Sequence, residues 1–170
     1  MILSKSKDPR LVTTRRGGTL SDEDHRRLAF WAALCAEHVL SIFEKYNPAD
    51  DRPRIAIMKT KAWAHGEIRT TDSKIAAYYA NQAGRDVDKP AKYAAYSAGQ
   101  AAVVAHVPEH GLGAAAYAIR AILEDSSLDS KVERAKEEWA WQVSRLPIEI
   151  RDLVIEDSKR RNELCWNVFL

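Results

Sequence analysis

Apolar residues recur at three- and four-residue steps along most of the chain, which is the period of one buried face of an α-helix. The clearest case follows Ser21, whose hydroxyl and the three acids after it are typical of a helix start. The apolar stripe that begins there predicts a helix to about Tyr46, with one buried face and with Glu37 pointing away from it. The stripe consists of Leu28, Trp31, Cys35, His38, Val39, Ile42 and Tyr46.

Further helix starts are marked by a proline in the first turn or by a capping residue. Pro53 and Pro90 each follow an aspartate by two residues, and Ser130-Lys131-Val132-Glu133 has the form of a capping box. No segment shows the sustained polar–apolar alternation of a strand. The sequence therefore predicts an all-α, single-domain helical bundle of about seven helices. After the first, the predicted helices span about 51–66, 71–85, 88–106, 108–121, 130–146 and 147 onward.

Small residues dominate the middle of the chain, where residues 91–121 include twelve alanines. Ala95, Gly99 and Ala102 would share one helix face with almost no side-chain bulk, so another helix can approach its backbone closely. The same kind of face would suit a homodimer interface. A structural or dimerising module is therefore one alternative for the function of this chain.

Charge and length narrow the classes of partner. A chain of 170 residues corresponds to about one domain, and 26 Lys and Arg against 24 Asp and Glu give no general attraction to nucleic acid. No apolar run approaches the ~18 residues of a membrane helix, so we expect a soluble cytoplasmic protein without a membrane partner. Cys35 and Cys165 lie in apolar surroundings and are expected to be reduced packing thiols.

The N-terminal segment is the most basic part of the chain. Residues 1–16 hold five Lys and Arg and a single acid, Asp8. Such a composition predicts a basic, poorly ordered arm over residues 1–20, ahead of a helical domain that spans residues 21–170.

The stretch His106-Val107-Pro108-Glu109-His110 has the H-x-x-E-H spacing of a zinc hydrolase motif, in which two histidines on one unbroken helix hold the metal. Pro108 argues against that interpretation, because the residue before a proline avoids the α-helical region. We therefore expect one helix to end near His106 and the next to begin at Pro108, with Glu109 in its first turn. Gly111 and Gly113 fit a crowded joint between these two helices.

A different metal site is an alternative. His38, on the predicted buried stripe, could face His106 and His110 across the bundle. Three histidines with an open fourth position would suit catalytic zinc or nickel. The spacing is similar to that of the DinB-like helical-bundle metalloproteins, which would make the chain a metal-dependent enzyme.

Several longer motifs lie between residues 35 and 151, within a resemblance that extends over roughly residues 8–155. They are CAEHVL at 35–40, DRPR at 51–54, AWAHGE at 62–67, AGQA at 98–101, AHVPEHGLGAAAYA at 105–118 and Leu146-Pro147 ahead of Ile150-Arg151. Together these motifs resemble a family of bacterial immunity proteins, the all-α fifth type among the neutralisers of polymorphic toxins. The run at 105–118 is the most specific. The polar run Met58-Lys59-Thr60-Lys61 departs from the alanine-rich helix expected there.

The resemblance implies a non-enzymatic protein without a cofactor, which binds a cognate toxin and blocks its active site or its access to substrate. Such a protein needs an exposed patch on rigid helices, with aromatic or arginine anchors that fill pockets of the partner. The candidates for this binding role are Glu37, Arg52, Arg54 and one of Trp139 and Trp141.

Overall fold

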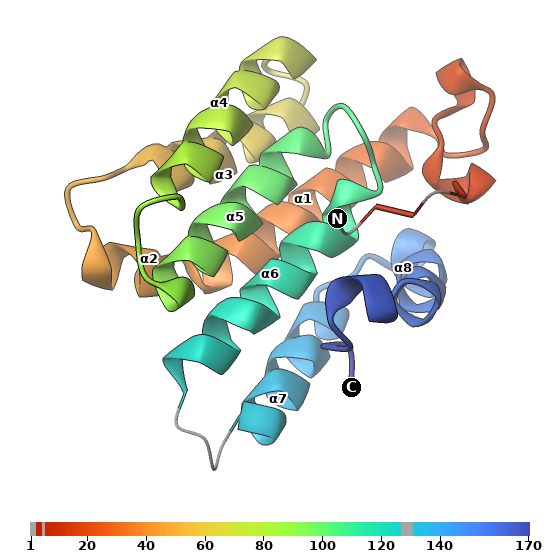
Figure 1. Cartoon of the computed structure of the whole chain (residues 1–170). Coiled ribbons are helices and arrows are strands. Elements are labelled where there is room, and N and C mark those ends of the chain that lie inside the picture. The colour runs from red at the N-terminus through yellow and green to blue at the C-terminus, as the bar shows by residue number, and fades with distance from the viewer. Residues whose placement is uncertain (1–2, 5, 127–130) are drawn as a thin grey trace.

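The computed structural model describes residues 3–4, 6–126 and 131–170, and in these residues the chain forms eight α-helices and no strand (Figure 1). The all-α prediction is confirmed, with one helix more than expected. The Ser130 capping box lies outside the described residues, and no helix among them is long and apolar enough to cross a membrane. The helices are α1 (Asp22–His38), α2 (Leu40–Tyr46), α3 (Arg52–Ala64), α4 (Thr70–Ala83), α5 (Lys89–Val103), α6 (His110–Asp125), α7 (Lys131–Ser144) and α8 (Ile148–Arg160).

The extra helix arises because the first predicted helix is divided at Val39, whose φ of −107° and ψ of 4° are not helical. Val39 itself remains buried, as predicted. His38 does not: its side chain is 41% exposed, so its predicted burial is wrong. At the last turn of α1 the stripe reaches the edge of the bundle beside α7, where Trp141 stacks on one face of the imidazole ring. Tyr46, at the end of α2, is exposed for the same reason, since it lies at the edge of the bundle.

Helix α5 lies at the centre of the bundle and contacts α1, α2, α3, α4 and α6 (Figure 1). The alanines along it, such as Ala95 and Ala102, are fully buried. A Cβ added at Gly99 would lie 2.5 Å from Oδ1 of Asn81 in α4, because the Asn81 side chain fills the space beside this glycine. The predicted small-residue face is thus confirmed. It is covered by helices of the same chain, which removes the reason to assign it to a homodimer.

The joint between α5 and α6 shows the predicted break at HVPEH. Helix α5 ends at Val103 and α6 begins at His110, so Glu109 is a buried residue at the N-cap position of α6 and not part of its first turn. Gly111 in α6 packs directly on α1, since an added Cβ would lie 2.9 Å from Cδ1 of the buried Leu28. The two helices can meet here only because residue 111 has no side chain.

The C-terminal segment is attached to the same joint by Arg161, which follows α8 and is only 1% exposed. Its Nε donates to Oδ1 of Asp157 at 2.9 Å, and its Nη2 donates to the carbonyl oxygen of Glu109 at 2.9 Å. A buried guanidinium needs such partners, because an unpaired charge in the interior is very costly. The bond to Glu109 therefore holds the end of α8 against the start of α6.

Residues 8–20 do not form the poorly ordered arm that their charge predicted. Leu11 and Leu20 are each 3% exposed, and Leu11 belongs to the main hydrophobic core. The backbone closes on itself, with the Leu20 N–H donating to the carbonyl of Val12 at 3.0 Å. The basic side chains stay outside while the two leucines anchor the segment, so composition alone was a poor guide to its order.

The contact between Gly111 and Leu28 can be tested by substitution. Gly111→Val should lower the free energy of unfolding by about 1–3 kcal/mol, because the new side chain has to displace a buried leucine. Leu28→Ala opens the same space, so the double variant should be less destabilised than the sum of the two single changes. Urea unfolding of the wild type and the three variants measures this. If the losses of unfolding free energy in the two single variants added up to the loss in the double variant, the contact between Gly111 and Leu28 would be contradicted.

Candidate functional site

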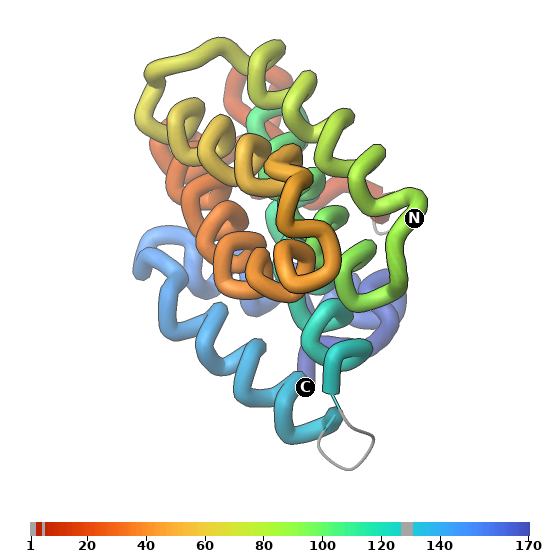
Figure 2. Tube along the Cα trace, turned by 90° about the vertical axis from the view of Figure 1, so that its left-hand side faces the viewer, coloured from red at the N-terminus to blue at the C-terminus, as the bar shows by residue number. Residues whose placement is uncertain are grey.

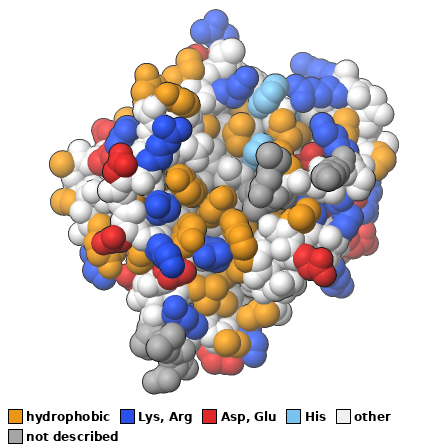
Figure 3. Space-filling view, in the orientation of Figure 1, with side chains coloured by type: hydrophobic (Ala, Val, Ile, Leu, Met, Phe, Trp, Pro, Cys, Tyr) orange, Lys and Arg blue, Asp and Glu red, His pale blue; other side chains and the backbone are white. Residues whose placement is uncertain are grey.

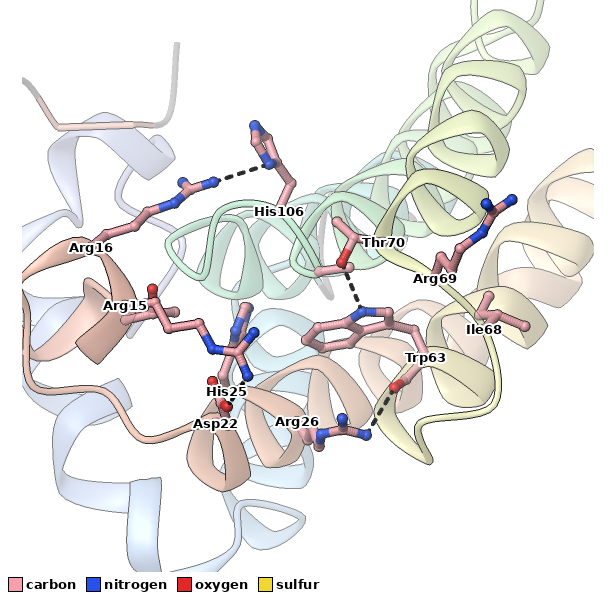
Figure 4. Close-up of a pocket in the computed structure, with 12 residues that line it drawn as sticks. Arg15, Arg16, Asp22, His25, Arg26, Trp63, Ile68, Arg69, Thr70 and His106 are labelled. Atoms are coloured by element: carbon pink, nitrogen blue, oxygen red, sulfur yellow. Dashed lines mark hydrogen bonds and ion pairs between the residues drawn. The ribbon is translucent and has the colours of Figure 1, made fainter.

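A basic hollow of about 460 Å³ lies at one end of the bundle, where the N-terminal segment, the start of α1, the α3–α4 turn and the α5–α6 joint meet (Figure 4). On the face seen in Figure 3, Lys and Arg side chains gather beside histidines at the upper right, near this end of the molecule. Four arginines dominate the charge of the lining. The ionisable and aromatic lining residues are Arg15, Arg16, Asp22, His25, Arg26, Trp63, Arg69 and His106.

Two glycines place Arg15 and Arg16 at the hollow. Both arginines lie in the short 3-10 helix Thr14–Arg16, which ends at Gly17 with a φ of 84° that disfavours other residues. A Cβ added at Gly18 would lie 2.0 Å from the carbonyl oxygen of Val12, so this position has no room for a side chain. The tight loop that results presents Arg16 toward His106 at the α5–α6 joint and Arg15 toward Asp22 at the start of α1 (Figure 4).

A third glycine shapes the opposite wall of the hollow. Gly66 follows α3 with a φ of 80°, and a Cβ there would lie 2.6 Å from Nη1 of Arg26. The Arg26 guanidinium occupies that space, where its Nη1 donates to the carbonyl of Ala64 at 3.4 Å. Beside it, Nε1 of Trp63 donates to Oγ1 of Thr70 at 3.1 Å and fixes the indole ring against the start of α4.

The histidines of the hollow are neutral at neutral pH, so its charge comes from the arginines. The pKa of His106 is lowered by burial and then by the nearby cations Lys74 and Arg16. Arg16 Nη2 lies 3.3 Å from Nδ1 of His106, a contact in which a neutral imidazole accepts. Burial also lowers the pKa of His25, whose Nε2 donates to the Val104 carbonyl at 2.7 Å. The arrangement suits the binding of an anion.

The three histidines of the alternative metal site are not brought together. His38 Nδ1 donates to Oε2 of Glu138 at 2.8 Å, and His106 contacts Arg16 at the hollow. Nδ1 of His110 is 2.7 Å from Oε1 of Gln100. Within the described ranges, no group of three or more His, Cys, Asp or Glu side chains is placed to hold a metal ion.

Three of the predicted binding residues lie along α1 and α3, which run side by side on the face that Figure 2 turns toward the viewer. Each forms an ion pair within the chain. Glu37 accepts from Nζ of Lys61 at 2.7 Å and links α1 to α3. The pairs of the other two residues are Arg52 Nε to Asp50 at 2.8 Å and Arg54 Nε to Glu44 at 2.8 Å.

The two tryptophans of α7 point in different directions, since residues two apart on a helix do not share a face. Trp139 packs on Phe169 with ring centroids 4.6 Å apart and belongs to the rim of the core. Trp141 instead stacks on the exposed His38 at 3.7 Å. Both tryptophans are half-buried, and Trp141 is the one that contacts an exposed side chain.

Sequence reasoning missed the hollow, because its arginines come from separate segments whose spacing carries no motif. One signal was present. The motifs AWAHGE and AHVPEHGLGAAAYA, far apart along the chain, both reach the hollow, the first through Trp63 and the second through Ala105 and His106.

Comparison with known proteins identifies the group to which this fold and these motifs belong. A family model described as "Imm-5 like putative immunity protein" matches residues 18–149. The chain belongs to this family. Most of the hollow lies within the region that matches the Imm-5-like family, whereas Arg15 and Arg16 precede it. No curated protein and no solved structure gave a significant match.

The buried His110 makes a testable contribution to pH dependence. Burial, then Arg161 and His106, lowers its pKa from 6.5 to about 4. As the pH falls, His110 takes up a proton in the unfolded chain before it does so in the folded protein. The contribution of the neutral His110 to the free energy of unfolding is therefore complete above pH 6.5 and is lost between pH 6.5 and about 4. Between these pH values the free energy of unfolding of the wild type should fall by up to ~1.4 kcal/mol per pH unit relative to that of His110→Gln, whose side chain cannot titrate.

Urea unfolding of both proteins at several pH values between 7.5 and 4 measures this difference. The other titrating groups are common to the two proteins, so their effects cancel in the comparison. Parallel stability curves for the wild type and His110→Gln would contradict the burial of a neutral imidazole at this position.

Proposed function

We propose that this protein neutralises a cognate bacterial toxin by binding to it in the cytoplasm, without chemistry or a cofactor of its own. The observation that carries the proposal is membership of the Imm-5-like immunity protein family over residues 18–149. An inhibitor of this kind works by occupying the partner's surface. What it requires from the fold is a patch that is exposed and already ordered before the partner arrives.

The Trp141–His38 pair is the best candidate for the centre of such a patch. The stacked rings border a depression of about 260 Å³, which is also lined by Ile122, Arg134 and the carboxylates of Glu137 and Glu138. Tryptophan is enriched among the few interface residues that contribute most of the binding energy. A ring held in place before binding loses less conformational entropy in the complex.

Buried hydrogen bonds under the pair keep it in place. The side chain of Glu138 is 1% exposed and accepts from His38 through Oε2. Its Oε1 accepts from Nε2 of Gln142 at 2.8 Å, and Gln142 is fully buried. Trp31 adds a further link, donating from Nε1 to the carbonyl of Gln142 at 2.8 Å. The end of α1 and the second half of α7 are thereby joined beneath the exposed ring of His38 and the half-buried ring of Trp141.

Charged residues on α1 and α3 can give specificity at little cost to the fold. The ion pairs Glu37–Lys61 and Arg54–Glu44 join α1 and α2 to α3 at the surface. Exposed ion pairs contribute only about 0–1 kcal/mol to stability, so their members can exchange partners when a toxin binds. We propose Glu37, Arg54 and Arg52 as the charged part of the interface and Trp141 as its aromatic anchor, with Trp139 in a packing role.

Co-expression with the toxin encoded beside this gene tests the proposal. The wild type should restore growth and should co-purify with the toxin. Trp141→Ala and Arg54→Glu should each weaken the complex on the order of 10- to 100-fold in Kd, because each removes an anchor from the interface. Lys159→Glu, a charge reversal on an exposed residue of α8, is the matched control and should leave the Kd unchanged.

The possible outcomes test the immunity function and the assigned binding surface separately. If the wild type neither binds nor protects, the immunity function is wrong for this pair of proteins. If it protects and both variants bind as tightly as the wild type, the function stands and the assigned surface is wrong. Circular dichroism of each variant confirms that a loss of binding is not a loss of folding.

A further inference from the structure

The basic hollow at the α3–α4 turn has no part in the toxin contact proposed above. His25 and Arg26 lie near the start of α1, whereas Glu37 and His38 end the same helix. At 1.5 Å per residue, the two sites are roughly 18 Å apart along the helix axis. The hollow therefore needs an explanation of its own.

The charge of the hollow is only partly neutralised within the chain. Arg15 pairs with Asp22 at 2.6 Å, and Arg69 pairs more loosely with Asp72 at 3.5 Å. Arg16 and Arg26 have no carboxylate partner in the described part of the chain. Arg16 contacts the neutral His106, and Arg26 contacts backbone carbonyls at the end of α3. Two guanidinium groups thus remain able to bind an external anion.

The groups around the two guanidinium groups give the hollow a positive potential and an apolar wall. The pKa values of His25 and His106 are both lowered, with Arg16 among the causes in each case, which is consistent with a positive potential in the hollow. Trp63 adds an apolar wall, with its ring 4.8 Å from that of His25 and the guanidinium of Arg26 at 5.8 Å from its centroid. An anion with an organic body would contact both kinds of surface.

Size and geometry distinguish between kinds of anion. A volume of about 460 Å³ falls within the range of roughly 300–1,000 Å³ that is typical of small-molecule sites. Guanidinium groups bind phosphate oxygens in a bidentate manner, and a phosphate monoester carries close to two negative charges at neutral pH. A single carboxylate would neutralise only one of the two available guanidinium groups.

We propose that the hollow binds a small organic phosphate, with Arg16 as the main ligand of the phosphate group and with Arg26 and Trp63 against the rest of the molecule. Arg15 and Arg69 have exposed side chains whose ion pairs lie at the surface, so both can turn toward the anion. This site would give an immunity protein a second ligand, independent of its toxin.

Thermal unfolding and calorimetry of the full chain test the proposal with two probes, inorganic phosphate and adenosine monophosphate. Both should raise Tm above the value in sodium chloride of equal ionic strength, since a ligand that binds only the folded state stabilises it. Adenosine, which lacks the phosphate, should not. Arg16→Ala and Arg26→Ala should each weaken binding of adenosine monophosphate on the order of tenfold.

Arg85→Ala is the matched control, because Arg85 is an exposed arginine at the other end of α4 and does not line the hollow. It should bind the probes as the wild type does. A Tm that follows ionic strength alone would overturn the proposal. An equal loss of affinity for adenosine monophosphate in Arg16→Ala, Arg26→Ala and the control would also overturn it. A glutamate-rich peptide that binds the hollow while both phosphate probes fail would assign the site to protein carboxylates and would also overturn it.

Discussion

The close approach of five helices to α5 is the constraint on which the rest of the structure depends. Helix axes normally lie 8–10 Å apart, and the separation is set by the side chains at the contact. The alanines of α5, together with Gly99, leave almost no bulk between its backbone and the helices around it. Small residues can be packed this tightly only in a few relative positions, so α5 fixes how α1, α3, α4 and α6 lie relative to one another.

Both sites proposed here follow from that arrangement of helix ends. The hollow forms where α5 stops at Val103 and the chain has to turn before α6, opposite the turn from α3 to α4. The Trp141–His38 pair forms where α1 stops beside α7. The pair needs no loop, whereas the hollow also needs the closed N-terminal segment that carries Arg16. A surface built from helix ends on a packed core is already ordered, which favours a protein that acts by contact.

Much of the fold could be predicted from local signals. The apolar period, the proline starts and the break at Pro108 gave the helices and most of their ends, because each of these effects acts over a few residues. Val39 shows the limit of such reasoning. The first predicted helix is divided at Val39, but the apolar residues keep their three- and four-residue spacing across this position. Periodicity therefore could not predict the division.

Residues whose role depends on distant partners were harder to predict. Arg161 follows two other basic residues in the sequence, a pattern typical of a solvated helix end. It is nevertheless buried, because Asp157 and the Glu109 carbonyl accept its hydrogen bonds. Leu11 anchors a segment whose composition suggested disorder. The hollow brings together arginines from the N-terminal segment, α1 and the start of α4, and only the three-dimensional structure shows that they meet.

Hydrogen exchange of the free protein and of its toxin complex tests most directly whether a rigid core centred on α5 presents a preformed surface. The amides of α5 should be the slowest to exchange in both states. Toxin should slow exchange of the amides around the ion pair of Glu37 with Lys61 and of those in α7. Exchange in α8 should stay unchanged. Fast exchange along α5 in the free protein, or toxin protection confined to α8, would contradict this account.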